Sequence, residues 1–312
     1  MSSGSRLTPV ESLKRERISF RHLQDQVFGV VGFIFTLVGI VTLCVLLIDL
    51  AIDGLGRIDW QFLTSFPSRR ASSAGILAAI VGSFLIMIVT LFAAVPLGMA
   101  AAIYLEEYAR KNWLTTIIEI NIANLAGVPS IIYGLMALGL LVGFAGLGYS
   151  ILAGGLTLAF LILPIVIVAT REALRAIPND IREAAYALGS TKWQVIRHHI
   201  LPYSAGGIAT GTIIAMSRAI GETAPLITIG ALTFIAFLPP SPVQANAPFF
   251  NVEWLDSPFT VLPIQMFNWI SRPTHDFHVN AAATGLVLIA MTLGMNALAL
   301  VVRYKSRRRI HW

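Results

Sequence analysis

Six long apolar runs constrain this chain more than any other feature of its sequence. They lie at about 27–50, 73–104, 114–142, 149–170, 205–238 and 281–303. A run of roughly 18 or more apolar residues is long enough to cross a bilayer as a helix. Because lipid offers backbone groups no hydrogen-bond partner, such runs must be helical. The sequence therefore predicts an all-α membrane protein with six transmembrane helices.

The composition agrees with membrane insertion and argues against a nucleic-acid partner. Hydrophobic residues make up 56% of the chain and charged residues 12%, and the mean hydropathy is +0.77. Soluble domains carry roughly 25% charged residues. The net charge of +6 comes from basic residues dispersed among the apolar runs, so membrane topology explains it better than nucleic-acid binding. The histidines show no ligand spacing, and we expect no metal and no cofactor.

Lysine and arginine are distributed unequally between the segments that separate the runs. Most of them fall in the two ends of the chain, the link at 110–111 and the loop at 171–203. The other set of segments holds four arginines: Arg57, Arg69, Arg70 and Arg272. Basic residues favour the cytoplasmic side. We therefore expect cytoplasmic tails at 1–26 and 304–312, a first helix at 27–50, and a core at 73–303 with a cytoplasmic loop at 171–203.

The loop at 171–203 is too regularly patterned for a simple connector. Pro178 and Asn179 form a helix start. Small or apolar side chains then recur at helical spacing and share one face: Ile181, Ala184, Ala185 and Leu188. Gly189 is a natural helix stop, Ser190 can cap a second helix at about 191–200, and Pro202 ends it. We expect two short helices joined at Gly189.

Two interpretations of this loop are open. Basic amphipathic stretches commonly lie on the membrane surface. However, the order Glu183-Ala184-Ala185, three residues, Gly189, and later Leu201-Pro202 resembles the EAA loop of ABC importer permeases. The resemblance implies that the loop is the coupling helix that docks into an ATP-hydrolysing subunit, through Glu183, Ala184, Ala185 and Gly189, with Arg182 on its charged flank. His199 departs from the pattern, which has Ile there.

Two further motifs narrow the resemblance to the permeases of phosphate importers. They are LAGVPSIIYGL at 125–135 and GETAPLI at 221–227, and the second is more similar to the PstA type than to the PstC type. The resemblance implies a MetI-like core of five helices preceded by one, in the plasma (inner) membrane of a prokaryote. It also implies phosphate transport by alternating access.

The same resemblance implies a set of partners. These are PstB-like ABC ATPase subunits, a second, PstC-like permease, and an extracytoplasmic PstS-like phosphate-binding protein. Independently of the resemblance, no glycine precedes any of the four lysines, so a phosphate-binding GKS or GKT loop is absent. We therefore expect a transport subunit that is not itself an enzyme and that takes ATP chemistry from a partner.

Two charged residues, Arg218 and Glu222, stand inside the fifth apolar run. Arg218 lies about 13 residues into that run, which at ~1.5 Å per residue predicts a position near mid-membrane. Glu222 follows four residues later on the same helix face. Either the two pair to fix helix packing, or Arg218 binds an anion in a wet pathway while Glu222 orients it. Intramembrane ionisable residues favour the second interpretation.

Neighbouring residues could extend this substrate pathway. Ser217 and Thr223 flank the charged pair, and Pro129 with Ser130 breaks the third run near its middle. Helix breaks often line cavities, where freed backbone groups meet water or substrate. A packing kink built from small residues is an equally good explanation of the break at Pro129 and Ser130.

Two alternatives to a phosphate importer remain at this level. A permease for another oxyanion or small solute would share the EAA-like loop. An ion-coupled carrier or channel would need no ATPase partner, and it would leave the loop pattern without an explanation.

Overall fold

The computed structural model describes residues 9–243 and 249–307, and the chain divides into two units, 1–52 and 53–312. The first unit consists of most of helix α1 (Pro9–Gly54). The stretch from Gln24 to Arg57 is long and apolar enough to cross a membrane. This agrees with the first predicted span, and its large apolar side chains, such as Phe28 and Phe35, are exposed.

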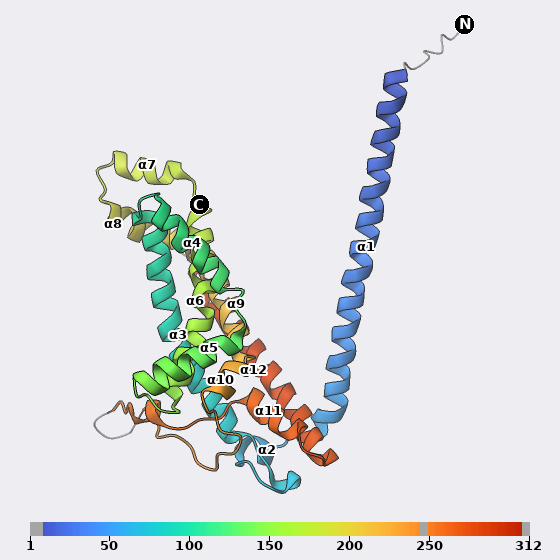
Figure 1. The fold of residues 1–312 in the computed structure, drawn as a ribbon, viewed down its shortest axis with the longest axis vertical. Helices are drawn as coiled ribbons and strands as arrows, with labels where there is room; N and C mark the ends of the chain where they lie inside the picture. Colours follow the sequence, from blue (N-terminus) through green and yellow to red (C-terminus); the bar gives the residue numbers. More distant parts are fainter. Residues whose placement is uncertain (1–8, 244–248, 308–312) are drawn as a thin grey trace. The chain divides into compact units, whose positions relative to one another are not determined.

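The second unit is built almost entirely of helices (Figure 1). In chain order its α-helices are α2 (Trp60–Thr64), α3 (Leu77–Ile103), α4 (Trp113–Leu125), α5 (Ser130–Ala137), α6 (Ile151–Arg175), α7 (Asn179–Ala187), α8 (Lys192–Val195), α9 (Leu201–Ile220), α10 (Ala224–Thr228), α11 (Leu262–Ile270) and α12 (His275–Arg307). Within the described residues there is no strand beyond an isolated bridge between Val243 and Phe250. The predicted all-α class is confirmed.

Among the described residues, five helical stretches could cross a membrane, and a bent pair gives a sixth. The five are Gln24–Arg57, Leu77–Tyr108, Ile151–Arg175, Lys192–Ile220 and His275–Val301. The pair is Trp113–Leu125 with Ser130–Phe144, whose two halves meet at 106°. These stretches correspond in order to the six predicted spans.

Helices α3 and α6 form the centre of the second unit. Their contact is close because Gly155 of α6 leaves no room for a Cβ beside Val89 of α3. Pro96 lies inside α3 and Pro164 inside α6, and both helices continue through their proline. Pro96 therefore does not divide the second span. A proline leaves one carbonyl without its helical donor, and neighbouring groups in a packed membrane helix can compensate.

The fifth span differs from its prediction at both ends. It begins at Lys192, where Thr191 and not Ser190 caps the helix in a reciprocal arrangement with Gln194. The helix then runs through η5 (Ile196–Ile200), a π-helical segment, directly into α9. Pro202 does not end it, since the helix continues through Pro202 at the point where the π-helical segment meets α9. The span stops at Ile220, well before the predicted end at 238.

A second packed region joins α11 and α12 to the segment that follows α1. Phe62, Trp269 and Phe277 are its largest buried side chains, and their rings lie within 6.3 Å of one another along the chain of contacts. Arg57 lies over the ring of Phe62 and donates to Asn280 of α12. This region ties the start of the second unit to its last helix.

Candidate functional site

Arg218 lies in the last turn of α9, and Glu222 lies just beyond the helix end. Gly221 is the C-terminal capping residue, and its N–H bonds the carbonyl of Arg218. The continuous helix runs from Lys192 to Ile220, so Arg218 lies near its end and not about 13 residues from its start. The expected depth of Arg218 near mid-membrane stays a prediction. The predicted span failed because GETAP ends the helix with a glycine and a proline, while its apolar neighbours look helical.

Arg218 and Glu222 nevertheless meet. Nε of Arg218 donates to Oε1 of Glu222 at 3.4 Å, with 41% of the arginine side chain and 20% of the glutamate side chain exposed. A pair this long and this open holds the guanidinium loosely and leaves part of the arginine side chain accessible. The arrangement can present a positive charge to an anion, and it is not sealed in helix packing.

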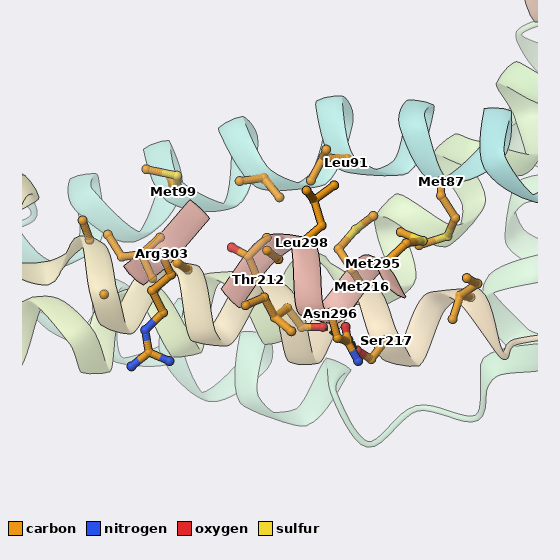
Figure 2. Close-up of a pocket in the computed structure, with 18 of the residues that line it drawn as sticks. Met87, Leu91, Met99, Thr212, Met216, Ser217, Met295, Asn296, Leu298 and Arg303 are labelled. Atoms are coloured by element: carbon orange, nitrogen blue, oxygen red, sulfur yellow. Dashed lines mark hydrogen bonds between the residues drawn. The ribbon is translucent and has the colours of Figure 1, made fainter. Parts of the chain in front are cut away.

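Ser217 points to a different place from Arg218. Its hydroxyl lies 2.7 Å from Oδ1 of Asn296 in α12, and both side chains line a cavity of about 840 Å³ between α3, α9 and α12 (Figure 2). Most of the lining is apolar, including Met87, Met216 and Met295. Arg218 is absent from the lining residues, so the charged pair and this cavity lie on different faces of α9.

The break at Pro129 is more pronounced than a packing kink. The helix stops at Leu125, α5 begins at Ser130 with Pro129 before it, and the direction changes by 106°. Tyr133 closes the gap, because its hydroxyl donates to the carbonyl of Leu125 at 2.8 Å. Pro129 is exposed and Ser130 is half-buried, so backbone freed by the break stays accessible.

The two breaks are joined through the short helices that follow them. Helix α5 packs against α10, and a Cβ on Gly134 would overlap the hydroxyl of Thr228 and approach the Cα of Pro225 to 2.6 Å. Thr223 is half-buried and precedes α10, and its carbonyl accepts from Leu226 and Ile227. The structure thus connects the elements carrying the predicted pathway residues, and no described hydrogen bond joins Ser130 to Arg218.

The loop between α6 and α9 turns at Gly189, as predicted, but its second helix is not a separate short one, because α8 continues through η5 into α9. Helix α7 ends at a glycine turn in which Gly189 has φ +82°. The N–H of Ser190 bonds the carbonyl of Ala185, and that of Gly189 bonds the carbonyl of Tyr186. These two hydrogen bonds, together with the left-handed glycine, form a Schellman motif at the end of α7.

The predicted apolar face of α7 is divided between two environments. Ala185 is buried and, with Ile181, packs on Leu174 and Ile177 at the end of α6. Ala184 and Leu188 are exposed, Leu188 to 88%. The outer surface of the loop also exposes Glu183, Tyr186 and Trp193. One face therefore anchors the loop, and the other is open to a partner.

Arg182 turns toward its own chain. Its side chain is 16% exposed and pairs with Glu107, Nη2 to Oε1 at 3.0 Å, beyond the end of α3. It also donates to the carbonyls of Leu174 and Ile177. The sequence could not identify Glu107, because the contact joins residues 75 positions apart. Asn296 was missed for the same reason, since it lies 79 positions from Ser217, and no local pattern marks Tyr133 as the partner of Leu125.

Taken together, the bent helices and the two-helix loop have the fold of a known class of membrane permease. The structure matches the inward-facing MetNI methionine ABC transporter with a TM-score of 0.54 at 15% identity, covering 76% of this chain and 98% of that one. The fold is therefore that of a MetI-type ABC importer permease.

Sequence comparison gives the family. Residues 94–311 match the family described as "Binding-protein-dependent transport system inner membrane component", and the chain belongs to it. It is 31% identical over 300 residues to the phosphate transport system permease protein PstA of Yersinia pestis, covering 94% of this chain and 95% of that protein. It is also 35% identical over 182 residues to the probable ABC transporter permease protein YqgI of Bacillus subtilis, covering 58% of this chain and 62% of YqgI.

Proposed function

We propose that this chain is one permease subunit of an ATP-driven importer that moves inorganic phosphate across the inner membrane by alternating access. The observation that carries the proposal is the accessible guanidinium of Arg218, held at the end of α9 by Glu222 at 3.4 Å. Similarity to PstA proteins over nearly the whole chain supports phosphate as the substrate.

The chemistry of the pair suits a tetrahedral oxyanion. A guanidinium can donate two parallel hydrogen bonds to a phosphate and stays charged at any physiological pH. Glu222 competes for the same donors, so phosphate binds Arg218 without being held too tightly to leave. Because a single 3.4 Å contact between partly exposed side chains joins Arg218 to Glu222, the pair can open when an anion arrives.

The partners follow from the family and from the open surfaces. A transport system dependent on a binding protein needs that protein outside and an ATPase inside. We assign the exposed face of the loop, with Glu183, Ala184 and Leu188, to the ATPase. Arg218 is exposed on its own chain, so we infer that a second permease completes the pathway opposite it.

The first test removes the charge of Arg218. Arg218→Gln should lower phosphate uptake by at least roughly a hundredfold, because an anion in the membrane would lose its charged partner. Uptake of radiolabelled phosphate into proteoliposomes containing the assembled transporter measures the effect. Arg175→Gln is the control, since Arg175 is also a partly exposed arginine in an ion pair but lies at the end of α6.

The second test keeps the charge and changes the geometry. Arg218→Lys should transport measurably but several-fold less than the parent, because an ammonium cannot make the paired planar contact. Sulfate added in excess should compete weakly if the site is selective for phosphate. Near-normal uptake by Arg218→Gln, in a complex that still contains every subunit, would rule out the pathway role.

A further inference from the structure

The cytoplasmic end of the α3 stretch is a π-helical turn, η3 (Tyr104–Tyr108), with an unusual arrangement of partners. The N–H of Ala109 bonds the carbonyl of Tyr104, which defines the wide turn. Three consecutive side chains in it, Glu106, Glu107 and Tyr108, each meet a cation from a different helix. π-Helical turns inside longer helices occur frequently at functional sites.

These contacts connect η3 to the loop at two points. Arg182 of α7 pairs with Glu107, and Lys192 of α8 lies 5.0 Å from the ring centroid of Tyr108. The third contact leads elsewhere: Glu106 binds Arg175 and Arg171 of α6, at 2.9 and 3.4 Å. The loop is therefore fastened to the end of α3 through both of its short helices.

The Arg182 guanidinium is fully used. Nε and Nη2 donate to Glu107, the two Nη atoms donate to the carbonyls of Ile177 and Leu174, and Nη1 also donates to Asn179. The side chain of Glu107 is 8% exposed and that of Arg182 is 16% exposed. Two charges removed from water in this way are strongly coupled, because loss of one leaves the other buried and unpaired.

Apolar packing alone attaches α7 only weakly to the membrane helices. In α7, which the structure describes throughout, Ala185 is the one buried side chain. By contrast, α8 continues through η5 into α9 as one helical stretch. Movement of the loop therefore reaches α9 through the covalent helix, whereas it can reach α3 through the polar contacts with η3.

We propose that Arg182 and Glu107 are positioning residues that make α3 follow the loop when an ATPase moves it. The inference rests on the proposed function, because it takes the loop as the docking element. The pair acts as a rigid link between α7 and η3, and Lys192 with Tyr108 supports it. When both the covalent connection to α9 and the polar contacts with η3 are intact, α3 and α9 move together.

The first experiment measures the link in the chain alone. In a Cys44→Ser background, spin labels at Tyr104→Cys and Leu188→Cys, both exposed positions, report the distance between η3 and the loop. We expect a narrow distance distribution in the parent and in the Arg175→Gln control. The distance distribution should broaden in Arg182→Gln and in Glu107→Gln. In Arg182→Lys, which keeps the charge, it should be narrower than in Arg182→Gln but broader than in the parent.

The double variant Arg182→Gln with Glu107→Gln protects the test against simple misfolding. It leaves no buried unpaired charge, so it should fold even where a single variant does not. If the residues act as a pair, its distribution should be no broader than that of either single variant. Additive broadening, a broad parent distribution or no broadening in any variant would overturn the proposal.

The second experiment measures coupling in the complete transporter. Phosphate imported per ATP hydrolysed should fall roughly tenfold in Arg182→Gln, within the usual range of coupling between sites, and stay unchanged in Arg175→Gln. An unchanged ratio in Arg182→Gln would overturn the link. If the parent complex imports no phosphate while the distance results hold, the proposed function fails and the link stands.

Discussion

At the scale of single residues, Arg57 shows how one side chain can organise a whole face of this protein. Its guanidinium donates to Asn280 of α12, to Asp59, and to the carbonyls of Ser72 and Ala74. Its side chain is 14% exposed. The segment after α1 has little regular structure, so these hydrogen bonds replace a helix or sheet in holding it to α12.

Removal of the Arg57 side chain should lower the stability of the protein. Arg57→Ala removes the donor to the partly buried carbonyl of Ala74 and to Oδ1 of Asn280, together with the ion pair to Asp59, and we expect a loss of about 2–3 kcal/mol in the free energy of unfolding. Thermal unfolding of the purified protein in detergent measures it. Arg69→Ala, at an exposed arginine nearby, should change stability by less than about 0.5 kcal/mol. Equal losses in the two variants would contradict this role.

The charged residues also show what the sequence can predict at this scale. The pairing of Arg218 with Glu222 was predictable because the two are four positions apart. The position of Arg218 along its helix was not, because it depends on where the helix starts and stops. The burial of Arg182 against Glu107 was also hidden, since a local sequence pattern places Arg182 on a charged flank and says nothing of a distant carboxylate.

At the scale of elements, broken helices distinguish this fold from a bundle of straight ones. The sequence located the break at Pro129 because a proline disfavours the helical conformation of the residue before it. Pro96 and Pro202, by contrast, lie within continuous helical stretches, and the predicted helix end at Pro202 is wrong. The difference lies in tertiary packing: α3 is held along its length by α6, while α4 and α5 have largely exposed faces.

The turn at Gly189 gives a prediction for the loop as an element. Its φ of +82° is a left-handed conformation that costs a β-branched residue about 1–3 kcal/mol. Gly189→Val should therefore distort the junction of α7 and α8 and lower transport per ATP hydrolysed. Gly189→Asn is the matched control, because asparagine tolerates this conformation. Paired ATPase and uptake assays in proteoliposomes measure both, and equal behaviour of the two variants would argue against a docking role for the loop.

At the scale of the whole molecule, the sequence predicted the all-α class, and the family comparison agrees with the resemblance carried by the EAA-like loop. It did so because bilayer thickness and backbone hydrogen bonding leave few solutions for long apolar runs. The large cavity between α3, α9 and α12 was not predictable, since it results from helices that are separate in sequence.

Topology is the prediction that belongs to this scale. The distribution of basic residues predicts that the loop at 171–203 lies in the cytoplasm and the segment before α11 outside. In a Cys44→Ser background, a membrane-impermeant maleimide should label Val252→Cys in intact cells, and Leu188→Cys after permeabilisation. Both side chains are exposed, at 69% and 88%, so access to the thiol is not limited by burial. The reverse labelling order would invert the proposed orientation.

The path of the chain at the 106° bend between α4 and α5 determines whether the number of membrane crossings is odd or even. If the bent pair passes from one leaflet to the other, the candidate spans of the described residues add up to six passages, and both ends of the polypeptide share a compartment. If the pair dips in and returns, the passages number five and the ends are on opposite sides. A reporter fused to each end would thus reveal whether the bent pair α4–α5 crosses the membrane or returns to the side from which it enters.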